Sequence, residues 1–238
     1  MENSTEAGQY LGMADAIHEH GFVALEEMMG SELSIVNAAR VSFNQTSQEL
    51  SERDMGLINF LMRERHSTPF ERISFSFVVK CPLFVAREWM RHRMASYNEW
   101  SARYSEIDEE FYVPADSHVR EQHGKAGDYY FLPIEDPKVV DETQYLIDYT
   151  QREAFRAYHR MLEIGAAKEV ARTVLPVGMF TKFTVTMNLR STLNFLSLRN
   201  EDHAQEEIRD YAKAVEDLVT MQIPYVMEKW NEHGRQPI

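Results

Sequence analysis

Cysteine is nearly absent from this 238-residue chain, which contains only Cys81. A single thiol excludes an internal disulfide framework and a cysteine-based zinc cluster, and it suits a reducing compartment, so a cytoplasmic location is expected. Long apolar runs are also missing, since no stretch reaches the roughly 18 apolar residues of a membrane-spanning helix. Residues 1–30 are acidic and lack the basic and apolar regions of a signal peptide.

Basic residues are in the minority. The chain has 25 lysines and arginines against 38 acidic residues, for a formal net charge of −13. A negative field of this size disfavours nucleic acids and anionic membranes as partners. Any anionic ligand must therefore be bound by a local group of cations. With 44% hydrophobic residues, the chain can bury a sizeable core as one domain, or at most two.

Generic site signatures are missing as well. The sequence has neither a glycine-rich dinucleotide fingerprint nor a phosphate-binding P-loop. His18 and His20 are spaced as possible metal ligands, but no third ligand follows in a defined pattern, so no metal is expected. Cys81 stands between Lys80 and Pro82 without a neighbouring histidine, which favours a small buried side chain over a nucleophile.

The hydrophobic pattern predicts an α+β fold. Alternation in Ile73–Lys80 and again up to Asn188 predicts strands, the first with one buried face, and residues 22–25 could open another. Helical spacing predicts helices after the candidate N-caps Ser31 and Ser51, from Pro82 to Met90, over 142–165 and 168–175, and twice after Asn188. Residues 111–113 are expected as a short strand and 114–137 mostly as loop. We expect a loose leader over 1–20 and a single domain over 21–238, in which a mainly antiparallel sheet packs with several long helices.

The stretch Arg91–Tyr104 is too polar for a core and too aromatic for a plain solvated surface. It combines three guanidiniums with an imidazole, hydroxyls, an amide and a carboxylate, and the helix from Pro82 leads directly into it. Such groups suit a planar, anionic ligand such as a nucleotide. The alternatives are an exposed segment whose charges are only solvated, or an RNA-binding module that stacks bases on the aromatic side chains. The net charge disfavours the RNA-binding module.

A second polar cluster follows Asn188. On a helix, Arg190, Asn194 and Ser197 share one face, whereas Arg199 lies almost opposite Arg190. One helix would then present polar groups to two ligands, or to sites in two subunits. Capping and surface roles are the alternative for each of these residues.

The order Arg-His-Arg-x-x-Ser-x-Asn-Glu-x-Ser-x-Arg-Tyr over residues 91–104 resembles the signature of the flavin-dependent thymidylate synthases. The turn from His66 to Glu71 is similar to that family's His-x-x-Pro-Phe-Glu element, and the resemblance extends from about Ser42 to Gln205. It implies a single α+β domain and a homotetramer whose active sites are shared between subunits.

The resemblance also implies site residues. For FAD it implies contacts from Ser42, Thr68, Glu71, Arg91, His92, Arg93, Glu99, Asn188, Arg190 and Asn194. For dUMP it implies contacts from Glu88, Arg91, Glu99, Ser101, Ala102, Arg103, Arg172 and Arg199. Arg199 matches the catalytic arginine that stabilises the uracil as its N3 ionises, and His66 lies near the flavin and folate end. Glu88 departs from the family pattern, because many members have glutamine there.

The implied reaction is the reductive methylation of dUMP to dTMP. 5,10-Methylenetetrahydrofolate would give the carbon, and FAD reduced by NADPH would supply the hydride. No cysteine nucleophile is needed, in contrast to the flavin-independent thymidylate synthases, and the order of methylene and hydride transfer stays open. A second enzymatic alternative is a folate- and flavin-dependent methyltransferase acting on uracil in tRNA, which usually carries the dinucleotide fingerprint that is absent here.

Overall fold

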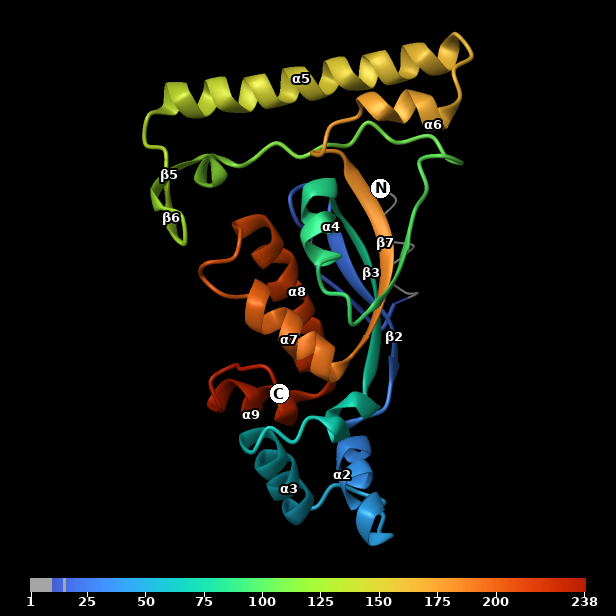
Figure 1. The fold of residues 1–238 in the computed structure, drawn as a ribbon, viewed down its shortest axis with the longest axis vertical. Helices are drawn as coiled ribbons and strands as arrows, with labels where there is room; N and C mark the ends of the chain where they lie inside the picture. Colours follow the sequence, from blue (N-terminus) through green and yellow to red (C-terminus); the bar gives the residue numbers. More distant parts are fainter. Residues whose placement is uncertain (1–9, 15) are drawn as a thin grey trace.

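The centre of the molecule is a five-stranded antiparallel sheet with the strand order β1-β2-β3-β7-β4 (Figure 1). The computed structural model describes residues 10–14 and 16–238, so residues 1–9 and 15 of the expected leader lie outside the described residues. The strands of this sheet are β1 (Gly12–Met13), β2 (Phe22–Met29), β3 (Ser74–Pro82), β4 (Ser96–Glu99) and β7 (Phe180–Asn188). Together with the helices, this sheet confirms the predicted α+β class.

The two central strands follow the alternation that the sequence predicts. β3 pairs with β7 along its whole length, from Ser74 opposite Asn188 to Pro82 opposite Phe180. Phe75 and Phe77 are fully buried on one face, whereas the hydroxyls of Ser76 and Thr186 hydrogen-bond at 2.7 Å on the other. Side chains of successive residues point to opposite faces of a strand, so this alternation gives the sheet one apolar and one polar face.

Helices cover the apolar face of the sheet and its two ends. They are α2 (Glu32–Arg40), α3 (Glu52–Arg63), α4 (Leu83–Trp89), α5 (Pro137–Glu163), α6 (Lys168–Ala171), α7 (Leu189–Arg199), α8 (Glu206–Gln222) and α9 (Pro224–Glu232), with the 3₁₀ turns η2 (Val41–Phe43), η3 (Thr68–Arg72), η4 (Asp116–His118) and η5 (Arg172–Val174). Figure 1 shows α4, α7 and α8 against the sheet, with α2 and α3 at one end and α5 and α6 at the other. Ser31 and Ser51 are the N-cap residues of α2 and α3, as predicted.

The long helix α5 builds a second, smaller core. Its Phe155 and Tyr158 are fully buried and pack with Phe111 from the preceding loop and Ala171 from α6. The predicted helix is confirmed, but it begins at Pro137 because the Asp136 side chain caps it by accepting from the Lys138 N–H at 3.0 Å. Within the described part of the chain, no helix is long and apolar enough to cross a membrane.

The sequence predicted that residues 114–137 are mostly loop, and this prediction is wrong. They contain η4 and a hairpin of β5 (Arg120–Lys125) and β6 (Asp128–Pro133). Every residue of β6 is exposed, so no buried face produces the period-two pattern that would have predicted these strands. Residues 111–113 form no strand, because Phe111 makes only an isolated bridge to Met179.

The N-terminal segment joins the sheet in its described part. β1 pairs with β2, and the Leu11 and Ala14 N–H groups donate to the carbonyls of Leu25 and Val23 at 2.8 and 2.9 Å. The described residues within 1–20 therefore contribute a strand to the sheet, which begins earlier than residue 21.

Candidate functional site

The stretch Arg91–Tyr104 is a turn followed by an edge strand, not a continuation of the preceding helix. α4 ends at Trp89, and β4 then pairs with β7, from Ser96 opposite Thr186 to Glu99 opposite Phe183. The Tyr97 hydroxyl lies 2.8 and 3.1 Å from the carbonyl oxygens of His92 and Trp89. This contact ties the strand to the end of the helix, and it holds the polar residues of the turn beside the end of α7.

His92 and Arg199, one from each predicted cluster, meet Glu88 of α4 at this point, and we call these three residues the Arg199 cluster. The Arg199 guanidinium donates from Nε to His92 Nε2 at 3.0 Å and from Nη1 to Glu88 Oε2 at 3.1 Å. Its Nη2 donates to the Glu88 carbonyl at 3.4 Å. The Arg199 side chain is still 23% exposed. The fork of donors is thus fixed in direction while its charge remains accessible from one side.

Burial controls the protonation of this cluster. Burial, together with the nearby Arg199 cation, lowers the pKa of His92 to about 4, so the imidazole is neutral and its Nε2 accepts from Arg199. Burial also raises the pKa of the Glu88 carboxyl, against the opposing effect of Arg199. The result is a fixed cation beside a neutral imidazole, an arrangement that stabilises negative charge developing on a planar ring.

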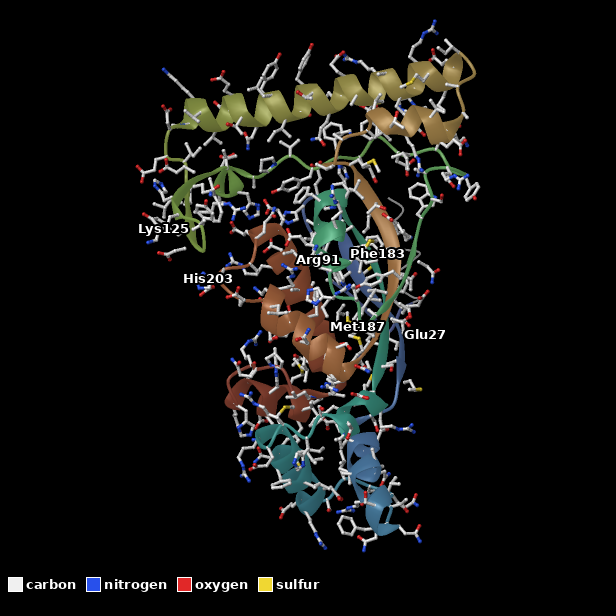
Figure 2. The ribbon with its side chains drawn as sticks, viewed as in Figure 1. Glu27, Arg91, Lys125, Phe183, Met187 and His203 are labelled. Atoms are coloured by element: carbon white, nitrogen blue, oxygen red, sulfur yellow. The ribbon has the colours of Figure 1, made fainter. Side chains whose placement is uncertain are left out.

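The lowered pKa of His92 predicts a pH-dependent stability. Between the ordinary value of 6.5 and about 4, the unfolded chain binds a proton at this histidine that the folded chain does not. The free energy of unfolding should therefore fall as the pH falls through this range. We expect a smaller fall in Tm for His92→Gln, which accepts from Arg199 without titrating. His203→Gln, in the exposed loop between α7 and α8 (Figure 2), serves as the control and should behave like the wild type. Equal pH profiles for all three proteins would contradict this assignment.

The other end of α7 carries a second ion pair. Arg190 donates from Nη1 to Glu71 Oε1 of η3 at 2.8 Å and from Nε to the Ile238 carbonyl at 3.1 Å. Asn188 caps the helix by accepting from the Ser191 N–H at 2.9 Å. Of the residues predicted to contact FAD, this part of the structure gathers Thr68, Glu71, Asn188 and Arg190, with the exposed Asn194 one turn along α7. His66 lies on the same connection, edge-on to Phe60 with ring centroids 5.7 Å apart.

Four of the residues predicted to contact dUMP, Ser101, Ala102, Arg103 and Arg172, lie beside or just after α6. Arg103 forms an ion pair with Glu169 of α6 at 3.2 Å, and Ala102 is buried in the same small core as Ala171. Arg172 follows Ala171 directly and is exposed. Arg103 and Arg172 thus lie on neighbouring segments, and Ser101 begins the turn by accepting from the Arg103 N–H at 3.3 Å.

Glu99 is not part of the Arg199 cluster, and its carboxylate accepts a hydrogen bond from the Thr181 hydroxyl of β7 at 2.7 Å. Arg91 and Arg93 are exposed, and neither guanidinium forms an ion pair within residues 10–14 and 16–238. Arg91 lies near the ends of α4 and α7 (Figure 2), and its N–H donates to the Glu88 carbonyl at 3.2 Å. Ser42 is exposed on η2 and makes no side-chain hydrogen bond within the described chain, so the structure does not join it to the other residues.

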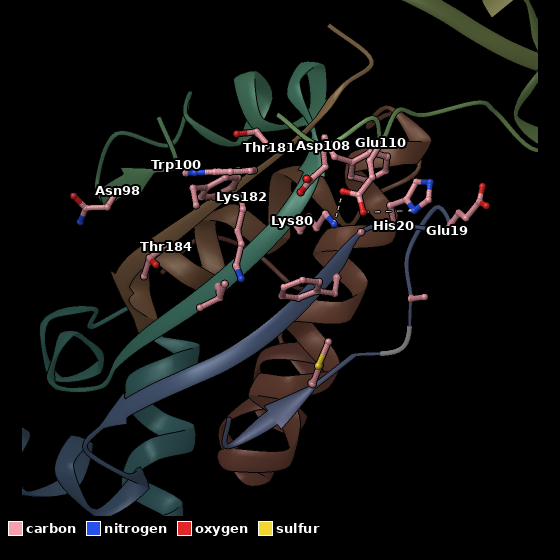
Figure 3. Close-up of a pocket in the computed structure, with 17 residues that line it drawn as sticks. Glu19, His20, Lys80, Asn98, Trp100, Asp108, Glu110, Thr181, Lys182 and Thr184 are labelled. Atoms are coloured by element: carbon pink, nitrogen blue, oxygen red, sulfur yellow. Dashed lines mark ion pairs between the residues drawn. The ribbon is translucent and has the colours of Figure 1, made fainter. Parts of the chain in front are cut away.

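A large pocket on the polar face of the sheet was not predicted (Figure 3). It has a volume of about 970 Å³ and includes Asn98 and Trp100 of the signature. Lys80 of β3 forms an ion pair with Glu110 in this pocket at 2.6 Å. Lys80 of β3 and Lys182 of β7 both line this pocket and pair with each other across the two strands. Each is a polar position in an alternating strand, but the sequence alone does not show that the two strands are neighbours. Glu169 and Thr181, which hold Arg103 and Glu99, were also missed, because neither stands in a recognisable motif.

Cys81 is fully buried at the end of β3. Burial raises the pKa of its thiol well above the ordinary value, so it does not form the thiolate that a nucleophile requires. We expect Cys81→Ala to retain the turnover that the family resemblance implies and to lose about 1 kcal/mol of stability through the small cavity that the substitution leaves. Steady-state kinetics and thermal unfolding measure the two quantities. Loss of turnover with normal folding and flavin content would contradict the structural role.

The fold is thus that of an α+β protein in which a partly exposed guanidinium is fixed between an imidazole and a carboxylate. A family model described as "Thymidylate synthase complementing protein" matches residues 24–225. The flavin-dependent thymidylate synthase of Thermotoga neapolitana is 43% identical over 216 residues, which cover 91% of this chain and 93% of the relative. The corresponding protein of Thermosipho africanus is 41% identical over 216 residues, covering 89% and 91%.

A solved structure gives the same result. The UMP/dUMP methylase PolB from Streptomyces cacaoi, bound with 5-Br dUMP, superposes with a TM-score of 0.84 at 36% identity, covering 92% of this chain and 97% of PolB. The chain therefore belongs to the flavin-dependent thymidylate synthase family, as its motifs predicted, and it is an enzyme.

Proposed function

We propose that this enzyme converts dUMP to dTMP by reductive methylation, with 5,10-methylenetetrahydrofolate as the carbon donor and FAD reduced by NADPH as the hydride source. The observation that carries this proposal is the Arg199 guanidinium, fixed by His92 at 3.0 Å and by Glu88 at 3.1 Å while still accessible. Supporting it are the names of the relatives and the dUMP analogue in the PolB structure.

In this proposal the protein binds and polarises the nucleotide. Ser101, Arg103 and Arg172 bind the phosphate, which suits two exposed guanidiniums on neighbouring segments. Arg199 stabilises the negative charge of the pyrimidine when N3 loses its proton, and that charge makes C5 electron-rich enough to attack the one-carbon unit. No protein nucleophile takes part, in keeping with the buried thiol of Cys81.

The residues around η3 and α7 fit a flavin. They offer a hydroxyl, a carboxylate, amides and a guanidinium at one exposed rim, and these groups match the donors and acceptors of a flavin edge and its ribityl chain. When bound, FAD supplies the two electrons that reduce a methylene to a methyl group. Because NADPH provides these electrons, tetrahydrofolate leaves without being oxidised. Arg190 and Glu71 would orient the cofactor, and Arg91, His92, Arg93 and Glu99 would border it.

Release of tritium from 5-tritiated dUMP tests this function directly. We expect release that requires both NADPH and methylenetetrahydrofolate, one NADPH oxidised per dTMP, and a flavin absorption band near 450 nm (roughly, for any oxidised flavin). UMP should be assayed in parallel, because the similar protein PolB is a methylase of both UMP and dUMP. A flavin-loaded protein that acted on neither nucleotide would refute the substrate assignment. A colourless protein that bound RNA with a steep salt dependence would favour the RNA-binding alternative.

We further propose a homotetramer whose active sites draw residues from more than one subunit. Arg190 and Arg199 are nine residues apart on α7, which is about 13.5 Å along the helix axis, and they bind partners on different elements. Two guanidiniums at that separation cannot both contact one planar ring, so each serves a different part of an active site or a different site. A cytoplasmic location is part of the same proposal and is supported by the single, buried thiol.

A further inference from the structure

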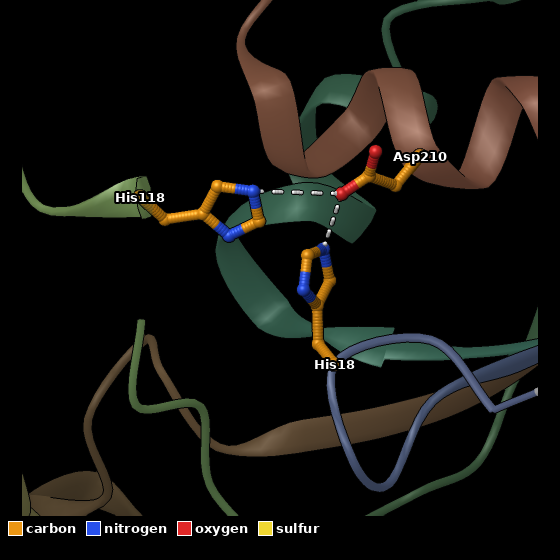
Figure 4. A group of neighbouring side chains, drawn as sticks. All are labelled: His18, His118 and Asp210. Atoms are coloured by element: carbon orange, nitrogen blue, oxygen red, sulfur yellow. Dashed lines mark ion pairs between the residues drawn. The ribbon is translucent and has the colours of Figure 1, made fainter. Parts of the chain in front are cut away.

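A cluster of two histidines and an aspartate, side-chain types that can ligate metal ions, lies outside the Arg199 cluster. It consists of His18 from the turn before β2, His118 from η4 and Asp210 from α8 (Figure 4). Asp210 Oδ2 is 3.3 Å from His18 Nε2 and 3.9 Å from His118 Nε2, and the three ligand atoms all lie within 4.8 Å of one another. Figure 4 shows both imidazoles turned toward the same carboxylate oxygen.

We propose that His18, His118 and Asp210 form a structural site for a divalent transition metal ion, with Zn²⁺ as the best fit. Zinc ligands lie about 2.0–2.2 Å from the ion, so two of its ligands in a tetrahedral site are about 3.3 Å apart. The His18–Asp210 separation of 3.3 Å equals this value, the His118–Asp210 separation of 3.9 Å exceeds it, and the two imidazole nitrogens lie within 4.8 Å of each other, so side-chain rotations must draw His118 closer when an ion binds. Two imidazole nitrogens and one carboxylate oxygen are ligand types that zinc prefers. This proposal replaces the sequence-based expectation of no metal, and it does not depend on the proposed function.

The hydrogen bonds around the cluster leave the ligand nitrogens available. The His18 side chain is only 8% exposed, and its Nε2 atom is buried without a hydrogen-bond partner in the described part of the chain. Buried polar atoms of this kind normally have a partner. The Tyr112 hydroxyl donates to Glu207 at 3.0 Å and lies 3.5 Å from His118 Nδ1. Its oxygen can therefore accept from Nδ1, which leaves Nε2 of His118 with a free lone pair facing Asp210.

The backbone holds His18 in place. His18 and Glu19 both have left-handed backbone conformations, with φ values of 50° and 67°, which are uncommon for non-glycine residues. Gly21 closes this turn, and any side chain there would collide with the Tyr211 hydroxyl of α8. The turn therefore packs closely against α8, in which Asp210 directly precedes Tyr211. This close approach positions the imidazole beside the carboxylate, although the two residues are far apart in the sequence.

The fourth ligand can come from Glu206 or from water. Glu206 Oε1 is 3.5 Å from His118 Nε2, while its other oxygen forms an ion pair with Arg120 Nη1 at 2.8 Å. Asp210 is 39% exposed, so water can also reach the ion. A bound ion would join three segments that are about one hundred residues apart in sequence, and it would stabilise the N-terminal turn against α8.

Calorimetric titration of the purified 238-residue chain with ZnCl₂, after treatment with a chelator and its removal, tests this site. We expect one saturable Zn²⁺ site per chain and a higher Tm with zinc than without it. His118→Ala and Asp210→Asn should each bind Zn²⁺ at least about 100-fold more weakly and lose the rise in Tm, because each removes a direct ligand. Asp210→Asn preserves the side-chain volume and therefore guards against a general folding defect.

His123→Ala is the matched control. His123 lies on the exposed hairpin, where it pairs with Glu121 at 2.9 Å, and it should leave zinc affinity unchanged. Circular dichroism and flavin content verify that each variant is folded. The proposal is refuted if the wild type shows no saturable binding, or if folded His118→Ala and Asp210→Asn bind zinc as the control does. The cluster would then be only an imidazole–carboxylate ion-pair network.

Discussion

Replacement of Arg199 with alanine is expected to lower kcat for dTMP formation by about 10²- to 10³-fold, the cost of removing one fixed group that stabilises developing charge. The structural reason is the orientation of the guanidinium, which His92 and Glu88 hold from two sides. Arg199→Lys should recover only part of the loss, because an ammonium keeps the charge but cannot donate in a fixed fork to both neighbours. Steady-state kinetics with dUMP at saturating folate and NADPH measure the effect.

Two comparisons separate this role from a merely structural one. Glu88→Gln keeps a hydrogen-bond acceptor and the backbone carbonyl that Arg199 Nη2 contacts at 3.4 Å, so its kcat should stay close to the wild-type value. Arg160→Lys, in an exposed pair with Glu163 on α5, should change neither kcat nor Tm. If Arg199→Ala retained wild-type kcat while Tm and flavin content were normal, the proposed stabilisation of the pyrimidine anion would be wrong.

The secondary structure was predictable wherever burial imposed a period on the sequence. β3 and β7 each bury one face, so Phe75 and Phe77 alternate with polar residues and the strand can be read directly. The hairpin β5–β6 has no such face. The end of α4 was predicted to within one residue, but the turn that follows it was not predicted, because no glycine or proline marks it and the Tyr97 hydroxyl that closes it comes from the following strand.

Motifs in the sequence nominated the members of the candidate site, whereas the contacts between them could not be predicted. His92 and Arg199 were assigned to different ligands, yet they are 107 residues apart in sequence and hydrogen-bonded in the fold. The same holds for His18, whose spacing with His20 suggested ligands on one turn. In the structure His20 instead points to Glu110 at 4.0 Å, and His18 meets His118 and Asp210. The spacing of residues along a sequence shows which side chains are neighbours on the same helix or strand. These clusters instead bring together side chains from different helices, strands and turns, so spacing could not predict them.

Mixing two inactive variants should restore activity if active sites are shared between subunits. Arg190→Ala and Arg199→Ala are the informative pair, because these residues lie at opposite ends of α7 and contact different elements, η3 and α4. Each variant alone has one defect in every site. In tetramers formed at random from equal amounts of the two, up to about a quarter of the shared sites receive both arginines intact, so activity should rise toward that fraction of the wild type.

Subunit exchange must be demonstrated independently, for example by native mass spectrometry of differently tagged chains. Arg91→Ala mixed with Arg199→Ala is the matched comparison, because the Arg91 N–H and Arg199 Nη2 both donate to the carbonyl of Glu88 within one chain. If Arg91 acts in the same site as the Arg199 of its own chain, this second mixture should stay inactive. Inactivity of both mixtures despite proven exchange would place Arg190 and Arg199 in one subunit's site, and α7 would then serve a single active site from both of its ends.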